Sequence, residues 1–146
     1  MLRNLATTVL VATMALTFSG AGLAGPREDQ LARYASAAKA ANPAFSGFSA
    51  DRGNTLYTKN FAGGKPDTPA CTSCHGKDPR AAGRTLTGKT IDPVALSAAP
   101  SRYTDPAKVE KWFKRNCNDT LGRECTSAEK ADFVAYLLSP GSRGTR

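Results

Sequence analysis

The segment Cys71-Thr72-Ser73-Cys74-His75 constrains this chain more than any other part of its sequence. Two thiols separated by two residues, followed at once by the only histidine of the chain, form the attachment sequence of a c-type haem. The thiols bond to the vinyl groups of the porphyrin and the imidazole binds the iron, so the chain must fold around a large planar group. The motif predicts one covalent haem c, attached through Cys71 and Cys74, with His75 as the proximal iron ligand.

Two other uses of the cysteine pair agree less well with the sequence. A thioredoxin-like redox pair follows a strand in a βαβ unit, whereas Cys71 follows the chain-breaking residues 63–66 and precedes a loop. A zinc site would have to recruit Cys117 and Cys125, and the eight-residue spacing of that second pair matches no common zinc pattern. We therefore expect haem rather than a dithiol or a zinc ion.

The first 24 residues have the order of a secretory signal peptide. Arg3 provides the positive start, an apolar run covers residues 5–18, and small residues end at Ala24. Export to the periplasm agrees with the haem motif, because covalent attachment requires an oxidising compartment. The apolar run is too short for a good membrane span, so we expect no stable membrane insertion after processing.

Periodicity and capping residues predict an all-α chain of about four helices and long loops, without a convincing strand. The expected helices cover residues 26–41, residues 50–60, a stretch opening at Asp105-Pro106, and a stretch opening with the capping box Thr126 to Glu129. Residues 76–104 show no sustained period. A loop of this length in a small domain needs something else to organise it, and a wrapped cofactor would do so.

These elements predict three parts in the mature chain. Residues 25–48 form an N-terminal helix and linker, residues 49–140 a monohaem cytochrome domain, and residues 141–146 a flexible tail. Within the domain, Gly53 and Tyr57 are expected to cross Phe133 and Tyr136, because glycine allows two helices to approach closely.

The chain is basic, with 20 Lys and Arg against 12 Asp and Glu. Charge alone does not choose among nucleic acid, an anionic membrane and an acidic protein as partner. Export and haem attachment both disfavour nucleic acid. We therefore expect no nucleic-acid binding, and the basic surface fits an acidic redox partner.

Cys117 and Cys125 remain outside the haem motif. In an exported protein, a disulfide that closes the turn between the third and fourth helices is the economical interpretation. For so short a loop the chain-entropy model assigns roughly 2 to 3 kcal/mol to such a bond.

The sixth position on the iron lacks its usual ligands. Met1 and Met14 both lie in the predicted signal peptide, and His75 is already used. The alternatives are a side-chain amide from Asn116 or Asn118, a lysine amine, a tyrosine such as Tyr103, or water.

The third helix favours one of these alternatives. Val109, Trp112 and Phe113 recur at helical spacing, and Asn116 follows on the same expected face. We therefore expect Asn116 to end an inward apolar stripe, with the next residue, Cys117, holding the amide in place. Position alone leaves the choice of ligand open.

Several segments together resemble the sphaeroides haem protein family, small class I cytochromes c with an asparagine as sixth ligand. The resemblance covers roughly residues 50–138. The segments that carry it are residues 63–69, 71–78, 87–93, 109–118 and 122–126, of which Val109-Glu-Lys-Trp-Phe-Lys-Arg-Asn-Cys-Asn118 is the most specific.

This resemblance implies a class I cytochrome c fold, Asn116 as the distal ligand and a bridge between Cys117 and Cys125. It also implies that the asparagine leaves on reduction and that the ferrous haem binds oxygen, nitric oxide or carbon monoxide. A dihaem cytochrome c and a membrane cytochrome b are the redox partners it implies. By position in class I cytochromes, the carbonyl of Pro93 is expected to accept the Nδ1–H of His75.

We therefore expect a periplasmic cytochrome that accepts electrons and binds a diatomic ligand such as oxygen or nitric oxide, with turnover as an oxidoreductase left open. The expected haem pocket comprises Trp112, Pro93, Val109 and Phe113. One alternative is a plain electron carrier whose haem stays six-coordinate. Another is a haem-based ligand sensor without turnover.

Overall fold

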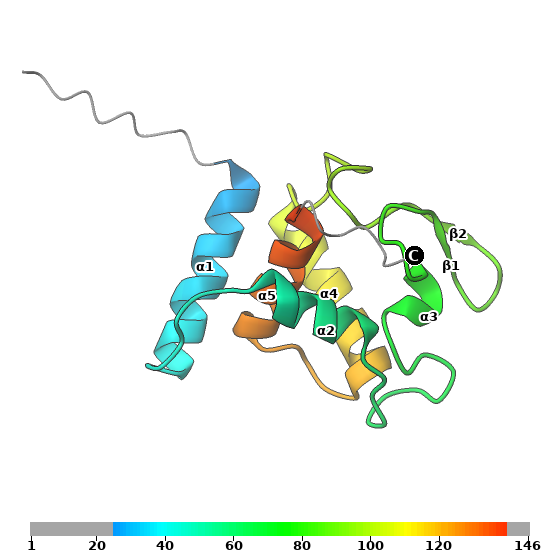
Figure 1. Cartoon of the computed structure of the whole chain (residues 1–146), viewed down its shortest axis with the longest axis horizontal. Coiled ribbons are helices and arrows are strands. Elements are labelled where there is room, and N and C mark those ends of the chain that lie inside the picture. Colours follow the sequence, from blue (N-terminus) through cyan, green and yellow to red (C-terminus); the bar gives the residue numbers. More distant parts are fainter. Residues whose placement is uncertain (1–24, 140–146) are drawn as a thin grey trace, which may run out of the picture.

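The computed structural model describes residues 25–139. The predicted signal peptide, residues 1–24, and the predicted tail, residues 141–146, lie outside the described residues. The elements, in chain order, are α1 Pro26–Ala41, α2 Ala50–Thr58, α3 Thr72–His75, β1 Gly83–Arg84, β2 Thr90–Ile91, α4 Pro106–Leu121 and α5 Ser127–Leu138 (Figure 1).

The four predicted helices are α1, α2, α4 and α5, and the all-α prediction is confirmed except in one loop. The haem motif itself forms the single helical turn α3. Within residues 76–104, β1 and β2 pair antiparallel, with Gly83 opposite Ile91. Strands of two residues are too short to show a period, and the turn between them depends on Gly88 at φ +82°.

Local side-chain chemistry sets the ends of α4 and α5. The Asp105 carboxylate accepts the backbone N–H of Lys108 at the start of α4, and Gly122 ends this helix in a left-handed conformation with φ 73°. Thr126 and Glu129 form the predicted capping box of α5. The short connection between these caps makes α4 and α5 neighbours in space.

The predicted crossing of α2 and α5 is present. A Cβ on Gly53 would lie 2.0 Å from the carbonyl oxygen of Asp132, so only glycine allows this approach. The buried carboxylate of Asp132 accepts two hydrogen bonds from Arg52 at 2.8 Å and one from the backbone N–H of Ser49 at 2.6 Å. These bonds satisfy a carboxylate that would otherwise be buried without a partner.

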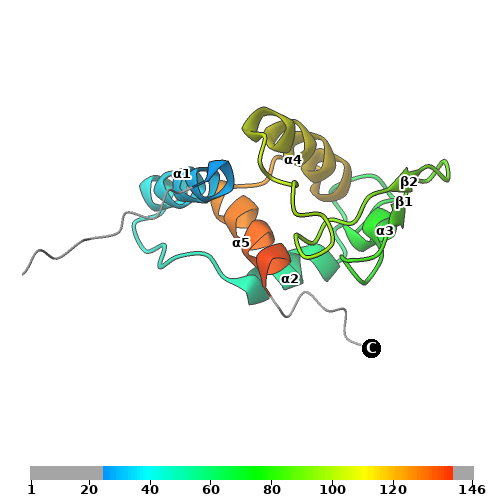
Figure 2. The ribbon, with the colours of Figure 1, turned by 90° about the horizontal axis from the view of Figure 1, so that it is seen from above.

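Helix α1 packs mainly against α5, and its buried residues are Gln30, Tyr34 and Ala38. Arg27 ties its first turn to the long loop by donating to the carbonyl of Pro100 at 2.8 Å. In both views α1 lies at one end of the molecule, and α3 with the β1–β2 hairpin lies at the other (Figure 2).

The core consists of two clusters, which we call the helix cluster and the motif cluster. The helix cluster includes Tyr34, Leu56, Val109, Phe113, Cys117, Leu121, Cys125, Ala131 and Val134. The motif cluster includes Tyr57, Val94, Leu96, Tyr136 and Leu137, and Cys71 packs against it. Tyr103 and Phe133 contact both clusters. Between residues 25 and 139, no helix is long and apolar enough to cross a membrane.

Candidate functional site

The haem motif folds so that its donor groups share one side of a helical turn. Cys71 has helical dihedrals, φ −60° and ψ −32°, and its carbonyl accepts the backbone N–H of His75 at 3.0 Å. Cys71, Cys74 and His75 therefore stand at positions i, i+3 and i+4 of a turn, which face the same way. This donor set fits a haem attached by two thioethers and bound by one imidazole.

Neighbouring residues fix this turn from several directions. The Tyr57 hydroxyl donates to the carbonyl of Gly76 at 2.7 Å, directly after the motif. The backbone N–H of Ala70 donates to the hydroxyl of Ser73 at 3.2 Å. A Cβ on Gly83 would lie 2.3 Å from the carbonyl oxygen of Cys74, so β1 packs tightly against the turn. The orientation of the motif is thus set by packing and hydrogen bonds of the surrounding protein.

The state of the cysteines argues against the dithiol and zinc alternatives. Cys71 and Cys74 form no disulfide. Burial, with a smaller contribution from Cys74, raises the pKa of Cys71 to about 11, whereas reactive redox thiols have a lowered pKa. Cys117 and Cys125 are bonded to each other, and residues 25–139 contain no cluster of three or more His, Cys, Asp or Glu side chains placed to hold a metal ion.

His75 is prepared to bind a metal through a neutral ring. Burial and the nearby charge of Arg102 lower the pKa of its imidazole, which leaves a nitrogen lone pair free at neutral pH. The expected bond from this ring to the carbonyl of Pro93 is absent among the described residues. The backbone after Pro93 turns instead toward Pro79, whose carbonyl accepts the N–H groups of residues 94 and 95 at 2.9 and 2.8 Å.

Helix α4 buries part of the expected apolar stripe. Val109, Phe113 and Cys117, spaced four residues apart, are buried in the helix cluster. Trp112 is 43% exposed and Asn116 is also exposed, although Asn116 follows Val109 by seven residues and lies within about 20° of it around the helix. The described protein residues therefore bury Val109 and Phe113 of the expected stripe and leave Trp112 and Asn116 uncovered, and the role of Asn116 as distal ligand stays a prediction.

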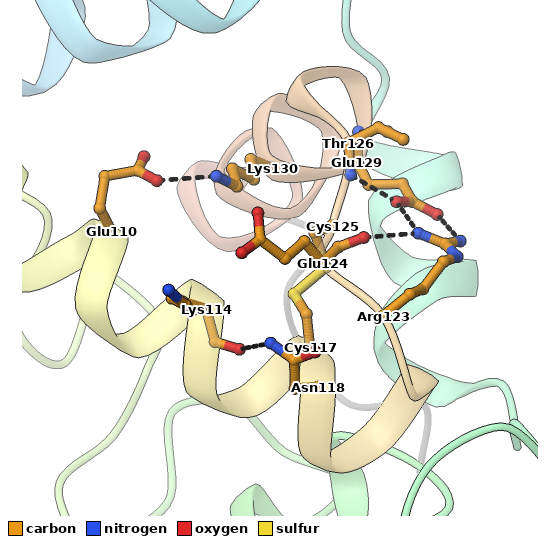
Figure 3. The surroundings of a disulfide bond; sticks show 10 residues. All are labelled: Glu110, Lys114, Cys117, Asn118, Arg123, Glu124, Cys125, Thr126, Glu129 and Lys130. Atoms are coloured by element: carbon orange, nitrogen blue, oxygen red, sulfur yellow. Dashed lines mark hydrogen bonds and ion pairs between the residues drawn. A yellow bond between two sulfur atoms is a disulfide. The ribbon is translucent and has the colours of Figure 1, made fainter.

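The two asparagines of α4 differ in how their amides are used. The Asn118 side chain donates to the carbonyl of Lys114 at 2.6 Å, one helical turn earlier (Figure 3). The Asn116 side chain makes no hydrogen bond within residues 25–139, so its amide oxygen is available to a ligand site. Tyr103, another sequence candidate, is committed elsewhere: its ring packs between the two clusters and its hydroxyl donates to Val94 at 3.3 Å.

The segment before the motif packs against the last turn of α4. The carbonyl of Asp119 accepts the backbone N–H of Lys65 at 2.7 Å and the hydroxyl of Thr68 at 3.2 Å. A Cβ on Gly64 would lie 2.3 Å from the same carbonyl oxygen. The helix that carries Asn116 and the turn that carries the haem motif are therefore joined through one short segment. The sequence signal for this contact is the pair Gly63-Gly64, which from the sequence alone indicates only a break between helices.

The predicted disulfide joins the end of α4 to the residue before the cap of α5. The Cα atoms of Cys117 and Cys125 are 5.6 Å apart, within the usual range for such a bond. Arg123, inside the loop, donates to both carboxylate oxygens of Glu129 at 2.8 and 2.7 Å (Figure 3). The residue after Asn116 is thus held by a covalent bond within a well-bonded turn.

Known proteins share this sequence and this fold. Residues 43–137 match the family model described as Domain of unknown function (DUF1924). The cytochrome c-type protein SHP of Cereibacter sphaeroides is 57% identical over 90 residues, which cover 62% of this chain and 70% of that protein. Cytochrome c'' of Methylophilus methylotrophus is 36% identical over 133 residues, covering 89% of this chain and 92% of that protein.

Solved structures agree with these matches. Oxidised SHP, described as an oxygen binding cytochrome c, aligns with a TM-score of 0.71 at 49% identity and covers 80% of this chain and 97% of its own. Oxidised cytochrome c'' from Methylophilus methylotrophus aligns with a TM-score of 0.69 at 38% identity and covers 78% and 94%. The chain thus belongs to the DUF1924 family, as a c-type cytochrome with a class I fold that is related to SHP and to cytochrome c''.

Proposed function

We propose that this protein is a periplasmic cytochrome that accepts an electron and then binds oxygen or nitric oxide at a position that Asn116 vacates. Cys71 and Cys74 attach one haem c, and His75 is its proximal ligand. The observation that carries the proposal is that the Asn116 side chain makes no hydrogen bond within residues 25–139, whereas Asn118 is anchored through its NH2 group. The residue after Asn116 is held by the disulfide, and the last turn of α4 is hydrogen-bonded to the segment that precedes the haem motif.

The haem supplies a one-electron couple and, at its iron, a position for a diatomic molecule. The amide oxygen of Asn116 is a hard and weak donor that suits Fe(III) and is held poorly by Fe(II). Reduction therefore favours release of this side chain. The buried face of α4 is packed through Val109, Phe113 and Cys117, so rotation of the Asn116 side chain leaves this packing in place.

The neighbours of Asn116 support a defined pocket on its side of α4. Trp112 lies one helical turn earlier and presents a large apolar ring at 43% exposure, a surface suited to the edge of a porphyrin. The description of SHP as an oxygen binding cytochrome c supports oxygen as the ligand class. By family resemblance, the electron donors are a dihaem cytochrome c and a membrane cytochrome b.

Absorption spectroscopy of Asn116→Ala, with Asn118→Ala as the matched control, tests the proposal. We expect the wild type to change from a low-spin oxidised spectrum to a high-spin reduced spectrum that shifts at once when carbon monoxide is added. Asn116→Ala should be high-spin already when oxidised, whereas Asn118→Ala should behave as the wild type. A sharp low-spin reduced spectrum that does not change when carbon monoxide is added would instead indicate an electron carrier whose haem stays six-coordinate. An unchanged Asn116→Ala protein would exclude this residue as the gate.

A further inference from the structure

A row of aromatic rings connects the haem motif with the N-terminal helix. Ring centroids are 6.2 Å apart between Tyr57 and Phe133, 5.5 Å between Phe133 and Phe113, and 6.1 Å between Phe113 and Tyr34. At one end, the Tyr57 hydroxyl is bonded to the carbonyl that directly follows the motif. At the other end, Tyr34 belongs to α1. Rings in contact over this whole distance offer an electron a path without a gap.

Tyr34 differs from the other tyrosines in the partner of its hydroxyl. Its O–H donates to the carboxylate of Glu110, whereas the hydroxyls of Tyr57 and Tyr103 donate to backbone carbonyls. The hydroxyl of Tyr136 makes no hydrogen bond to any residue from 25 to 139. A carboxylate can take up a phenolic proton and a backbone carbonyl cannot, so Tyr34 alone can lose a proton together with an electron.

The charges around Tyr34 favour the loss of its phenolic proton together with an electron. Burial raises the pKa of Tyr34, and its hydrogen bond to Glu110 raises it further, so the phenol is protonated at neutral pH. Burial also acts to raise the pKa of Glu110, but hydrogen bonds from Lys130 and Tyr34 outweigh it and hold the carboxyl ionised. The ammonium of Lys130 lies 5.7 Å from the Tyr34 ring centre and disfavours a cation on the ring. An electron can therefore leave only if the proton moves to Glu110.

We propose that Tyr34 is a redox-active tyrosine, which supplies one electron through the aromatic row when the haem reacts with a hydroperoxide. The peroxide O–O bond breaks as it takes up two electrons and two solvent protons; hydrogen peroxide gives two waters. One electron comes from the haem and one from Tyr34, whose phenolic proton passes to Glu110, leaving a neutral tyrosyl radical and a carboxylic acid. The proposal rests on the haem attachment but not on displacement of Asn116.

A pocket of about 400 Å³ opens beside this tyrosine and gives the radical a route to repair. Tyr34 and Glu110 line it together with Gln30, Arg33 and Lys130. A small one-electron donor of phenol or enediol type fits a pocket with these hydrogen-bonding and cationic groups. The donor returns an electron to Tyr34 while Glu110 returns the proton, so the row removes oxidising equivalents from the haem side of the protein.

Freeze-quench electron paramagnetic resonance of the haem-loaded protein mixed with hydrogen peroxide tests this inference. We expect a narrow radical signal whose hyperfine pattern changes when the tyrosines carry ring deuterium. Tyr34→Phe should lose that signal, Glu110→Gln should lose most of it, and Tyr136→Phe, the matched buried control, should retain it. A nitroso spin trap followed by peptide mass spectrometry should place the adduct on Tyr34.

Haem content and circular dichroism, measured on each variant, separate loss of the radical from loss of haem or fold. Survival of the full signal in Tyr34→Phe, or its loss in Tyr136→Phe instead, would overturn the assignment. A haem-loaded wild type without any tyrosyl signal would overturn the inference altogether. Failure of the carbon monoxide experiment on Asn116 together with a normal tyrosyl signal would refute only the gating function.

Discussion

Removal of the disulfide by the double substitution Cys117→Ala and Cys125→Ala is expected to lower the free energy of unfolding substantially. The bond closes a loop with a sequence separation of eight residues. In the chain-entropy model, opening a loop of this size lowers the free energy of the unfolded state by about 2.5 kcal/mol, because the unfolded chain gains conformational entropy. Both sulfur atoms belong to buried residues, so the alanines add a smaller loss from packing.

The native turn should survive this change. Arg123 still pairs with Glu129, and the capping box of α5 still forms, because neither depends on the sulfur atoms. The effect should therefore lie mainly in the unfolded state, which becomes more expanded. We expect the denaturant slope to rise along with the fall in stability, since this slope follows the surface exposed on unfolding.

Urea unfolding of the oxidised, haem-loaded protein, followed by circular dichroism, measures both quantities. Glu124→Ala, an exposed change within the same loop, is the matched control and should stay within about 0.5 kcal/mol of the wild type. A loss below about 1 kcal/mol in the double variant, at an unchanged slope, would refute the chain-entropy reasoning. It would show that the polar bonds of the turn already restrict this loop.

Two further perturbations follow from the fold. Gly53→Ala should lower the free energy of unfolding, measured in urea, by about 1 to 3 kcal/mol, because the added Cβ would meet the backbone of α5. Asn54→Ala in the same helix should be near neutral. An equal loss of stability in both variants would refute the close crossing of α2 and α5. Because the pKa of Glu110 is lowered in the folded protein, its contribution is present above the ordinary carboxyl pKa and is lost as the pH falls through the folded value. Glu110→Gln should therefore flatten the acid side of a plot of melting temperature against pH, and an unchanged plot would contradict the role of its bonds to Tyr34 and Lys130.

The sequence predicted structure best where the role of a residue depends only on its neighbours along the chain. The spacing of Cys71, Cys74 and His75 identified the haem turn, because no other common site needs an imidazole directly after two such thiols. Capping residues located the starts of α4 and α5, since Asp105 and Thr126 satisfy backbone donors that the helix leaves free. These features depend only on neighbours along the chain.

Contacts that depend on distant segments were harder to predict. Gly64 reads as a break in the sequence, but its missing side chain allows the carbonyl of Asp119 to approach. The spacing of Val109, Trp112, Phe113 and Asn116 predicts one face, but a helical period does not show which of its residues the neighbouring helices cover. Those helices bury Val109 and Phe113 and leave Trp112 and Asn116 exposed.

The packing of α4 explains how a weak ligand can act as a switch on the proposed assignment. Burial of Val109 and Phe113 stabilises the helix by about 1.5 to 3 kcal/mol for each side chain, independently of any bond made by Asn116. The disulfide at Cys117 and the contacts at Asp119 then fix the backbone on the C-terminal side of the asparagine. On this assignment, we expect a change of charge at the iron to be answered by rotation of the Asn116 side chain while the helix stays in place, so that the same position can be closed again when the electron leaves.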